Sequence, residues 1–145
     1  TIFATDFNDT AIKTAIDGVY HLDKIKKYTE NYQLAGGTGS FSEYYHAQYD
    51  SVIIDQSLKE QITFANHNLV TDSVFGEMHL ILCRNVLIYF NKDLQNRVLK
   101  LFNDSLAYQG FLCLGSKESL NLTAVEKEFR KINEKEKIFQ KKSRT

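Results

Sequence analysis

The stretch Leu80-Ile-Leu-Cys-Arg-Asn-Val-Leu-Ile-Tyr-Phe90 decides how this chain is interpreted. Its first four residues are apolar and predict a buried strand, which ends abruptly in Arg84 and Asn85. Open α/β sheets bind ligands just beyond the carboxyl ends of their strands. The sequence therefore predicts a binding site that uses a guanidinium and an amide at this strand end.

The composition is typical of one globular domain. The 145 residues are 43% hydrophobic and 25% charged, and 18 basic side chains balance 18 acidic ones. Because the net charge is zero, we expect neither nucleic acid nor an acidic membrane surface as a partner. The sequence has no apolar run of about 18 residues and no signal peptide at its start, so we expect no membrane insertion and a cytoplasmic location.

The cysteines and histidines do not indicate a metal centre. Cys83 and Cys113 fall in apolar, strand-like runs and predict buried thiols in a reducing compartment. The four histidines lack metal spacing, and none has an obvious nucleophile beside it. We therefore expect no metal site.

Strand-like and helix-like segments alternate along the chain, which favours an α/β fold. Strands are predicted at residues 2–5, 62–65, 80–83, 111–114 and 137–140. Helices are predicted to begin at Asn8 or Asp9, Lys24, Asn91 and Thr123. Residues 41–64 instead drift towards a period of two, which predicts two or three antiparallel strands in a small subdomain outside the main sheet.

Two polar residues that follow predicted strands have two interpretations each. The carboxylate of Asp6 could accept hydrogen bonds from both hydroxyls of a ribose, or it could organise the strand-to-helix turn together with Asn8 and Asp9. Asn68 could form hydrogen bonds with the edge of a heterocycle through its side-chain amide, or it could be a plain turn residue. The residues alone do not choose between these alternatives.

The residue types of Arg84 and Tyr89 also do not settle their roles. Arg84 could anchor a ligand carboxylate with two parallel hydrogen bonds, or it could form a structural ion pair. Tyr89 lies among apolar neighbours, so core packing is the simplest interpretation of that residue alone. Gly36, Gly37 and Gly39 are interpreted as a surface loop, because they neither follow a strand nor open a helix with GxGxxG spacing.

Several strings along the chain carry a resemblance to a known family. They are Ala4-Thr-Asp-Phe-Asn8, Ala15-Ile-Asp-Gly-Val-Tyr20, Phe64-Ala-Asn-His-Asn-Leu69, Cys83-Arg-Asn-Val-Leu-Ile-Tyr-Phe90 and Gly110-Phe-Leu-Cys-Leu-Gly115. In order and spacing the chain is similar to the chemotaxis-type protein-glutamate O-methyltransferases, over nearly its whole length. The chain thus resembles the C-terminal part of the catalytic domain of a CheR-like enzyme.

The resemblance implies a cofactor, a partner and roles for named residues. The cofactor would be S-adenosylmethionine, with Asp6 on its ribose, and with Asn68 and Leu69 lining the adenine pocket. Arg84, with Asn85 beside it, and Tyr89 would lie by the methionine portion and the transferring methyl group. The partner would be a methyl-accepting chemotaxis receptor, docked on the small β-subdomain at residues 41–64.

The chain also departs from the family pattern. Where the family carries a Gly-His-Ser-Glu string, this chain has Gly115-Ser-Lys-Glu118. The family's first strand, its glycine-rich cofactor loop and its helical N-terminal domain find no counterpart in the 145 residues. We therefore expect an incomplete Rossmann-like methyltransferase sheet with a gap between the Asp6 strand and the Leu80 strand. A longer parent protein, a strand-completing partner chain or self-association would fill that gap.

Three functions remain open at this level. The first is methylation of receptor glutamates by the parent protein, with the isolated chain expected to be inactive. The second is a non-catalytic module that binds a protein partner through the β-subdomain. The third is an α/β domain that acts on another nucleotide, because a ribose-binding carboxylate does not choose the nucleotide.

Overall fold

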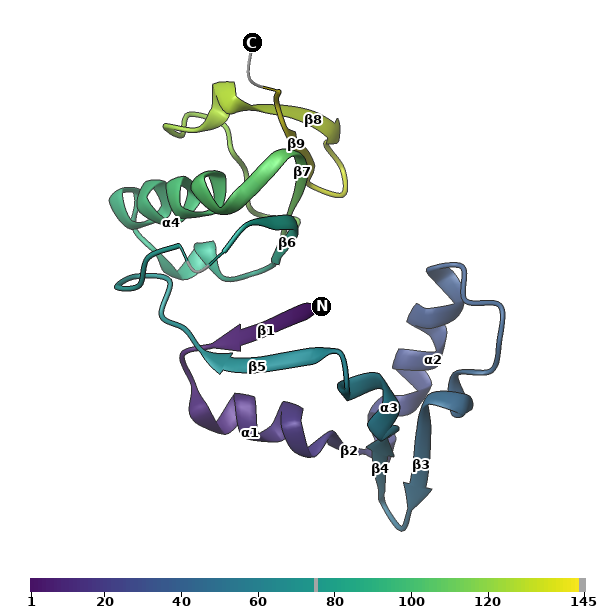
Figure 1. Cartoon of the computed structure of the whole chain (residues 1–145). Helices are drawn as coiled ribbons and strands as arrows, with labels where there is room; N and C mark the ends of the chain where they lie inside the picture. Colours follow the sequence, from purple (N-terminus) through teal and green to yellow (C-terminus); the bar gives the residue numbers. More distant parts are fainter. Residues whose placement is uncertain (75, 144–145) are drawn as a thin grey trace. The chain divides into compact units, whose positions relative to one another are not determined.

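The computed structural model describes residues 1–74 and 76–143. The chain divides into two compact units, Thr1–Asn68 and Leu69–Thr145 (Figure 1). Each unit combines strands and helices, as the α/β fold class predicted from the sequence requires.

The first unit is built on a pair of parallel strands. β1 (Ile2–Asp6) pairs with β5 (Ile62–Asn66) along its whole length, so that Asp6 lies opposite Asn66 at the carboxyl ends. α1 (Asp9–Asp17) follows β1 and runs along the strand pair (Figure 1). Its predicted limits are confirmed: the Asn8 side chain caps its first turn, and Gly18 ends it in the left-handed conformation at φ 67°.

A small antiparallel sheet forms the rest of the first unit. Its strand order is β2-β4-β3, from Val19–His21, Ser51–Ile54 and Tyr45–Gln48. Three connecting helices belong to it, namely η1 (Leu22–Lys24), α2 (Ile25–Leu34) and η2 (Phe41–Tyr44), and α3 (Gln56–Lys59) leads on to β5. The strands β3 and β4 lie within the predicted range 41–64. The third strand comes from before that range, and its three residues are too few to show a period of two.

The second unit contains a four-stranded sheet. Its order is β6-β7-β9-β8, from Met78–Cys83, Leu106–Leu114, Ile138–Lys141 and Phe129–Asn133. β6 and β7 are parallel, and the other two pairings are antiparallel. The connections contain η3 (Leu87–Tyr89), α4 (Lys92–Ser105) and η4 (Glu126–Glu128).

The core of the second unit lies where α4 meets the sheet. Val98, Leu99 and Phe102 of α4 are buried together with Leu112 and Leu114 of β7. Val98 and Phe102 are four residues apart and therefore lie on the same face of α4. Asn91 caps this helix as predicted, because its Oδ1 accepts a hydrogen bond from the Leu94 N–H at 3.0 Å.

Two element predictions in this unit were wrong. The helix predicted from Thr123 is a short 3₁₀ turn followed by strand β8. The charges of β8 reflect its position at the edge of the sheet, where four of its five residues are exposed. The strand predicted at residues 111–114 begins earlier, at Leu106, so Gly110 lies within β7, where a Cβ atom would come within 2.8 Å of the Ala107 carbonyl oxygen.

Strand β6 has a neighbour on one edge only. It pairs with β7, and no other strand in the described ranges pairs with it. Leu80 and Leu82 on this strand are 54% and 68% exposed. Unpaired backbone beside exposed leucines is what we expected of an incomplete Rossmann-like sheet.

Two leucines test this description of the core. Leu112 is fully buried, whereas Leu122 is 95% exposed. We expect Leu112→Ala to lower the free energy of unfolding by about 2–5 kcal/mol, because the substitution leaves a cavity between α4 and the sheet. Leu122→Ala is the matched control and should change it by less than about 0.5 kcal/mol. Urea denaturation followed by circular dichroism measures both, and similar losses in the two variants would contradict the assigned core.

Candidate functional site

In the first unit, candidate residues gather at the carboxyl ends of β1 and β5. Asp6 is exposed, and its Oδ1 accepts a hydrogen bond from the Asn8 N–H at 2.8 Å. Its Oδ2 accepts none within the described part of the first unit. Asp6 therefore organises the turn with one oxygen, and its second oxygen is available to a ligand.

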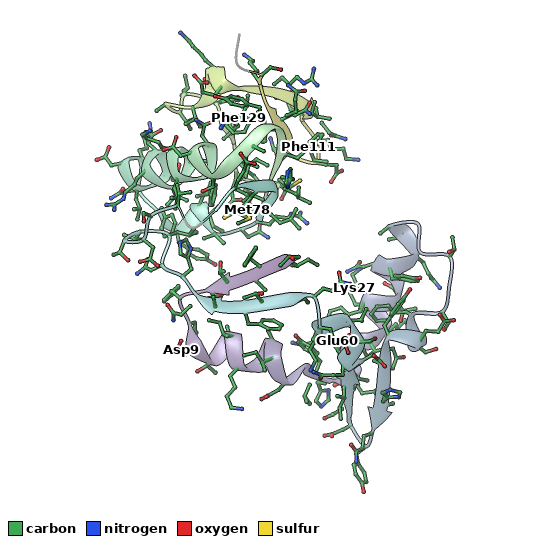
Figure 2. The ribbon with its side chains drawn as sticks, viewed as in Figure 1. Asp9, Lys27, Glu60, Met78, Phe111 and Phe129 are labelled. Carbon is green, nitrogen blue, oxygen red and sulfur yellow. The ribbon has the colours of Figure 1, made fainter. Side chains whose placement is uncertain are left out.

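Asn66 fixes this end of the first unit, and the sequence interpretation missed it. Its Nδ2 donates to the Phe7 carbonyl oxygen at 3.1 Å and to Asp9 Oδ1 at 2.7 Å. Asp9 is labelled in Figure 2 at the start of α1. Asn66 thus ties the end of β5 to the turn that follows β1. The signal was an Asn at a predicted strand end, which is common in turns and does not identify a partner.

Asn68 and Leu69 follow β5 and are half-buried. Asn68 is the last residue of the first unit, and Leu69 is the first residue of the second. Leu69 packs against the hydrophobic core of the second unit. Their predicted role at an adenine ring therefore stays a prediction.

In the second unit, Arg84 and Asn85 lie at the carboxyl end of β6. Both side chains are exposed. Arg84 forms no ion pair with the described residues of its own unit, so the alternative of a structural ion pair finds no support there. Burial raises the pKa of the Cys113 thiol, and the positive charge of nearby Arg84 partly opposes that rise. Arg84 therefore keeps its hydrogen-bond donors free for a ligand.

Tyr89 was expected to pack in the core if taken alone, and this interpretation is wrong. Its side chain is 81% exposed, while Leu87 at the start of the same 3₁₀ turn is buried. The turn is held from the α4 side, because Gln95 Nε2 donates to the carbonyl oxygens of Leu87 at 2.9 Å and of Phe90 at 3.0 Å. Tyr89 thus projects from a fixed turn.

A buried carboxylate, that of Glu118, joins the ends of β6 and β7. The side chain is 5% exposed. Its Oε2 accepts from the N–H of Gly115 at 2.6 Å and of Asn85 at 3.1 Å, and its Oε1 accepts from the N–H of Leu87 at 2.8 Å. The sequence alone assigned Glu118 no role. Its neighbours Ser116, Lys117 and Ser119 are polar, so the local residue types gave no signal that this carboxylate is buried.

The turn at Asn85 is closely packed. Asn85 has a φ of 61°, which is uncommon for a residue other than glycine. A Cβ atom at Gly115 would lie 2.4 Å from Asn85 Oδ1 and 2.7 Å from Asn85 N, so only glycine fits there. The exposed side chains of Arg84 and Asn85 consequently stand on a tightly constrained backbone.

The glycine-rich segment has a structural explanation. Gly37 lies against the Tyr32 ring, because a Cβ atom there would come within 2.3 Å of it, and the Gly39 N–H donates to the Tyr32 hydroxyl at 3.3 Å. The segment follows α2 and packs on its last turn, in agreement with the surface-loop interpretation.

Parallel strands with exposed polar residues at their carboxyl ends are typical of the class of α/β domains that bind nucleotides and related cofactors. The family model described as the CheR methyltransferase SAM-binding domain matches residues 1–138. The chain therefore belongs to the CheR methyltransferase family, and its cofactor is S-adenosylmethionine. The family resemblance inferred from the sequence is confirmed.

Named relatives agree with this assignment. The chain is 51% identical over 140 residues to a putative methyltransferase Cher3 of Pseudomonas putida, covering 97% of this chain and 51% of the relative. It is 30% identical over 134 residues to the chemotaxis protein methyltransferase of Escherichia coli K12, covering 88% of this chain and 43% of the relative. A chemotaxis protein methyltransferase of Listeria innocua is 31% identical over 119 residues, or 82% of this chain and 42% of the relative. The chain spans about half the length of these relatives, or less.

The residues present fit this cofactor. S-adenosylmethionine offers ribose hydroxyls, an adenine ring and a methionine carboxylate. Asp6 has a free carboxylate oxygen for hydroxyls, and Arg84 has an unpaired guanidinium for a carboxylate. Across the described residues, no group of three or more His, Cys, Asp or Glu is arranged to hold a metal ion. No helix in those same ranges is long and apolar enough to cross a membrane.

Cys83 provides a chemical test of the buried end of β6. Burial, with a smaller effect from the Glu118 charge, raises the pKa of the Cys83 thiol to about 12. The thiol is neutral below that pH, and only the thiolate reacts with alkylating reagents. At pH 9 we expect iodoacetamide to modify Cys83 at least about a hundredfold more slowly in the folded protein than in urea, with the folded rate rising as the pH approaches 12. Peptide mass spectrometry measures the rate, and equal rates in folded and unfolded protein would contradict the burial of Cys83.

Proposed function

We propose that this chain, as part of a longer methyltransferase, takes part in transferring methyl groups from S-adenosylmethionine to glutamate side chains of methyl-accepting chemotaxis receptors. The observation that carries the proposal is the turn after β6, where Arg84 and Tyr89 are exposed on a backbone held by Glu118 and Gln95. Relatives named chemotaxis protein methyltransferases support the receptor as substrate. The site of action would be the cytoplasm.

Each candidate residue would contact a different part of the cofactor. Asp6 would accept hydrogen bonds from the ribose hydroxyls with its free oxygen. Asn68 and Leu69 would line the adenine pocket, with the amide of Asn68 reading the ring edge. Arg84 would hold the methionine carboxylate through parallel N–H donors, beside Asn85.

The chemistry requires little acid–base assistance. The cofactor supplies a methyl group on a positively charged sulfur. A glutamate carboxylate is already ionised at neutral pH, so the acceptor needs no general base. The role of Arg84 and Tyr89 would be to hold the reactants in line, because proximity and orientation account for much of the rate in such transfers. The Tyr89 hydroxyl would donate a hydrogen bond to the acceptor carboxylate and aim it.

A second function is favoured by a different observation. Tyr49 is 92% exposed at the turn between β3 and β4, in a left-handed conformation at φ 55°. An exposed aromatic side chain at a hairpin tip is typical of protein interaction sites. The β-subdomain would then bind a protein partner, either as the receptor-docking part of the enzyme or as a module that does not catalyse.

The open edge of β6 completes the proposal. Leu80 and Leu82 are exposed beside backbone groups that have no ladder partner in the described sheet. A further strand, from a longer parent protein, a partner chain or a second copy, would pair with this edge and cover the leucines. The chain alone would then be inactive.

Arg84 tests the enzymatic proposal. In the full-length protein we expect Arg84→Ala to lower kcat/KM by about 10- to 100-fold, because one charge-assisted pair of hydrogen bonds to the cofactor is lost. The measurement is transfer of a radioactive methyl group from S-adenosylmethionine to a soluble receptor domain, scored as methanol released by base, since that release identifies a methyl ester. Arg97→Ala is the matched control, because Arg97 is also exposed and lies on α4.

Two results would contradict the proposal. Methylation that survives base treatment would exclude a glutamate ester as the product. An Arg84→Ala variant as active as the Arg97→Ala variant would remove Arg84 from the site. Tight binding of a receptor domain by a protein that transfers no methyl group would favour the binding module.

A further inference from the structure

Among the buried residues of the described chain, Glu118 is the one that is an Asp, Glu, Lys, Arg or His. It has no lysine, arginine or histidine within ion-pair distance in the described part of its unit. A buried carboxylate without a cationic partner is costly unless hydrogen bonds compensate it. The three N–H donors of Asn85, Leu87 and Gly115 supply that compensation.

These three bonds have a specific geometry. Each carboxylate oxygen is used: Oε2 receives two N–H donors and Oε1 receives the third. A glutamine has one carbonyl oxygen and one NH₂ group. In either orientation of the amide, the NH₂ group would face at least one main-chain N–H, and two donors cannot form a hydrogen bond. A neutral side chain of the same shape therefore cannot replace Glu118 without breaking at least one of the bonds.

The bonded amides belong to the segment that presents the candidate site residues. Arg84 directly precedes Asn85, whose left-handed conformation at φ 61° costs energy for any residue with a Cβ atom. Leu87 begins the 3₁₀ turn that carries Tyr89. Glu118 thus fixes the backbone at the residue after Arg84 and two residues before Tyr89.

We propose that Glu118 is a positioning residue, which holds Arg84 and Tyr89 in the orientation that cofactor and substrate require. This inference rests on the proposed function, because it names a residue that acts through Arg84 and Tyr89. Glu118 itself touches neither cofactor nor substrate. Its effect on cofactor binding passes through the main chain of residues 85 and 87.

A double-mutant cycle in the full-length protein separates positioning from general stability. The variants are Glu118→Gln, Arg84→Ala and both together, and the readout is the Kd of S-adenosylhomocysteine by calorimetry. We expect Glu118→Gln to weaken binding at least about tenfold when Arg84 is present and less than about threefold when it is absent. Glu126→Gln is the matched control, because Glu126 Oε2 also accepts a backbone N–H, that of Leu122 at 2.8 Å, but at the exposed end of the same loop.

The outcomes distinguish the two levels of the proposal. An equal loss from Glu118→Gln in both backgrounds would mean a structural role alone and would overturn the inference. No loss in the presence of Arg84 would overturn it as well. An Arg84→Ala variant that binds S-adenosylhomocysteine as tightly as the wild type would contradict the proposed function. The positioning role of Glu118 would then be contradicted as well.

Amide hydrogen exchange tests the hydrogen bonds in the unmodified protein, even if Glu118→Gln does not fold. We expect the N–H groups of Asn85, Leu87 and Gly115 to exchange at least about a hundredfold more slowly than in the unfolded chain. Unprotected amides at these three positions would overturn the inference. Glu118→Asp, which keeps the charge on a shorter side chain, should give the same pattern in the cycle with a smaller loss.

Discussion

The carboxylate of Glu118 accepts three main-chain N–H groups at the point where β6 and β7 end, and the candidate site depends on these bonds. Without them the turn after β6 would leave a buried charge uncompensated and Asn85 in an unfavourable conformation. A similar arrangement occurs in the first unit, where Asn66 at the end of β5 ties down the turn after β1. In both parallel pairs, a polar side chain that follows or ends one strand holds the turn after the neighbouring strand: Asn66 holds the turn after β1, and Glu118 holds the turn after β6. The candidate cofactor-binding side chains, Asp6 and Arg84, are exposed at these strand ends.

Much of the fold could be predicted from local sequence. The cap at Asn8, the stop at Gly18 and the cap at Asn91 each follow from backbone groups that a nearby side chain satisfies or that glycine's freedom allows. The strand ending at Cys83 could be predicted because an apolar run gives way to a guanidinium and an amide. That boundary also located Arg84 and Asn85 at the end of β6.

The remaining errors concern information that is not local. Tyr89 has apolar neighbours in sequence, but a 3₁₀ turn sends Leu87 inwards and Tyr89 outwards, and the turn itself depends on Gln95 and Glu118. Glu118 binds amides 31 and 33 residues away, and no periodicity reports such a distance. β2 and β8 were missed because three residues are too short for a pattern and because an edge strand carries charges like an exposed helix.

The central claim is that the turn after β6, held by Glu118, presents Arg84 to S-adenosylmethionine. Titrating the isotope-labelled full-length protein with S-adenosylhomocysteine, and following backbone amide chemical shifts, tests it most directly. We predict that the amides of Asn85 and Leu87 shift and give the same Kd, while the amide of Leu122, which lies outside this turn, does not shift. Unchanged shifts at Asn85 and Leu87 in a protein that binds the ligand would contradict the claim.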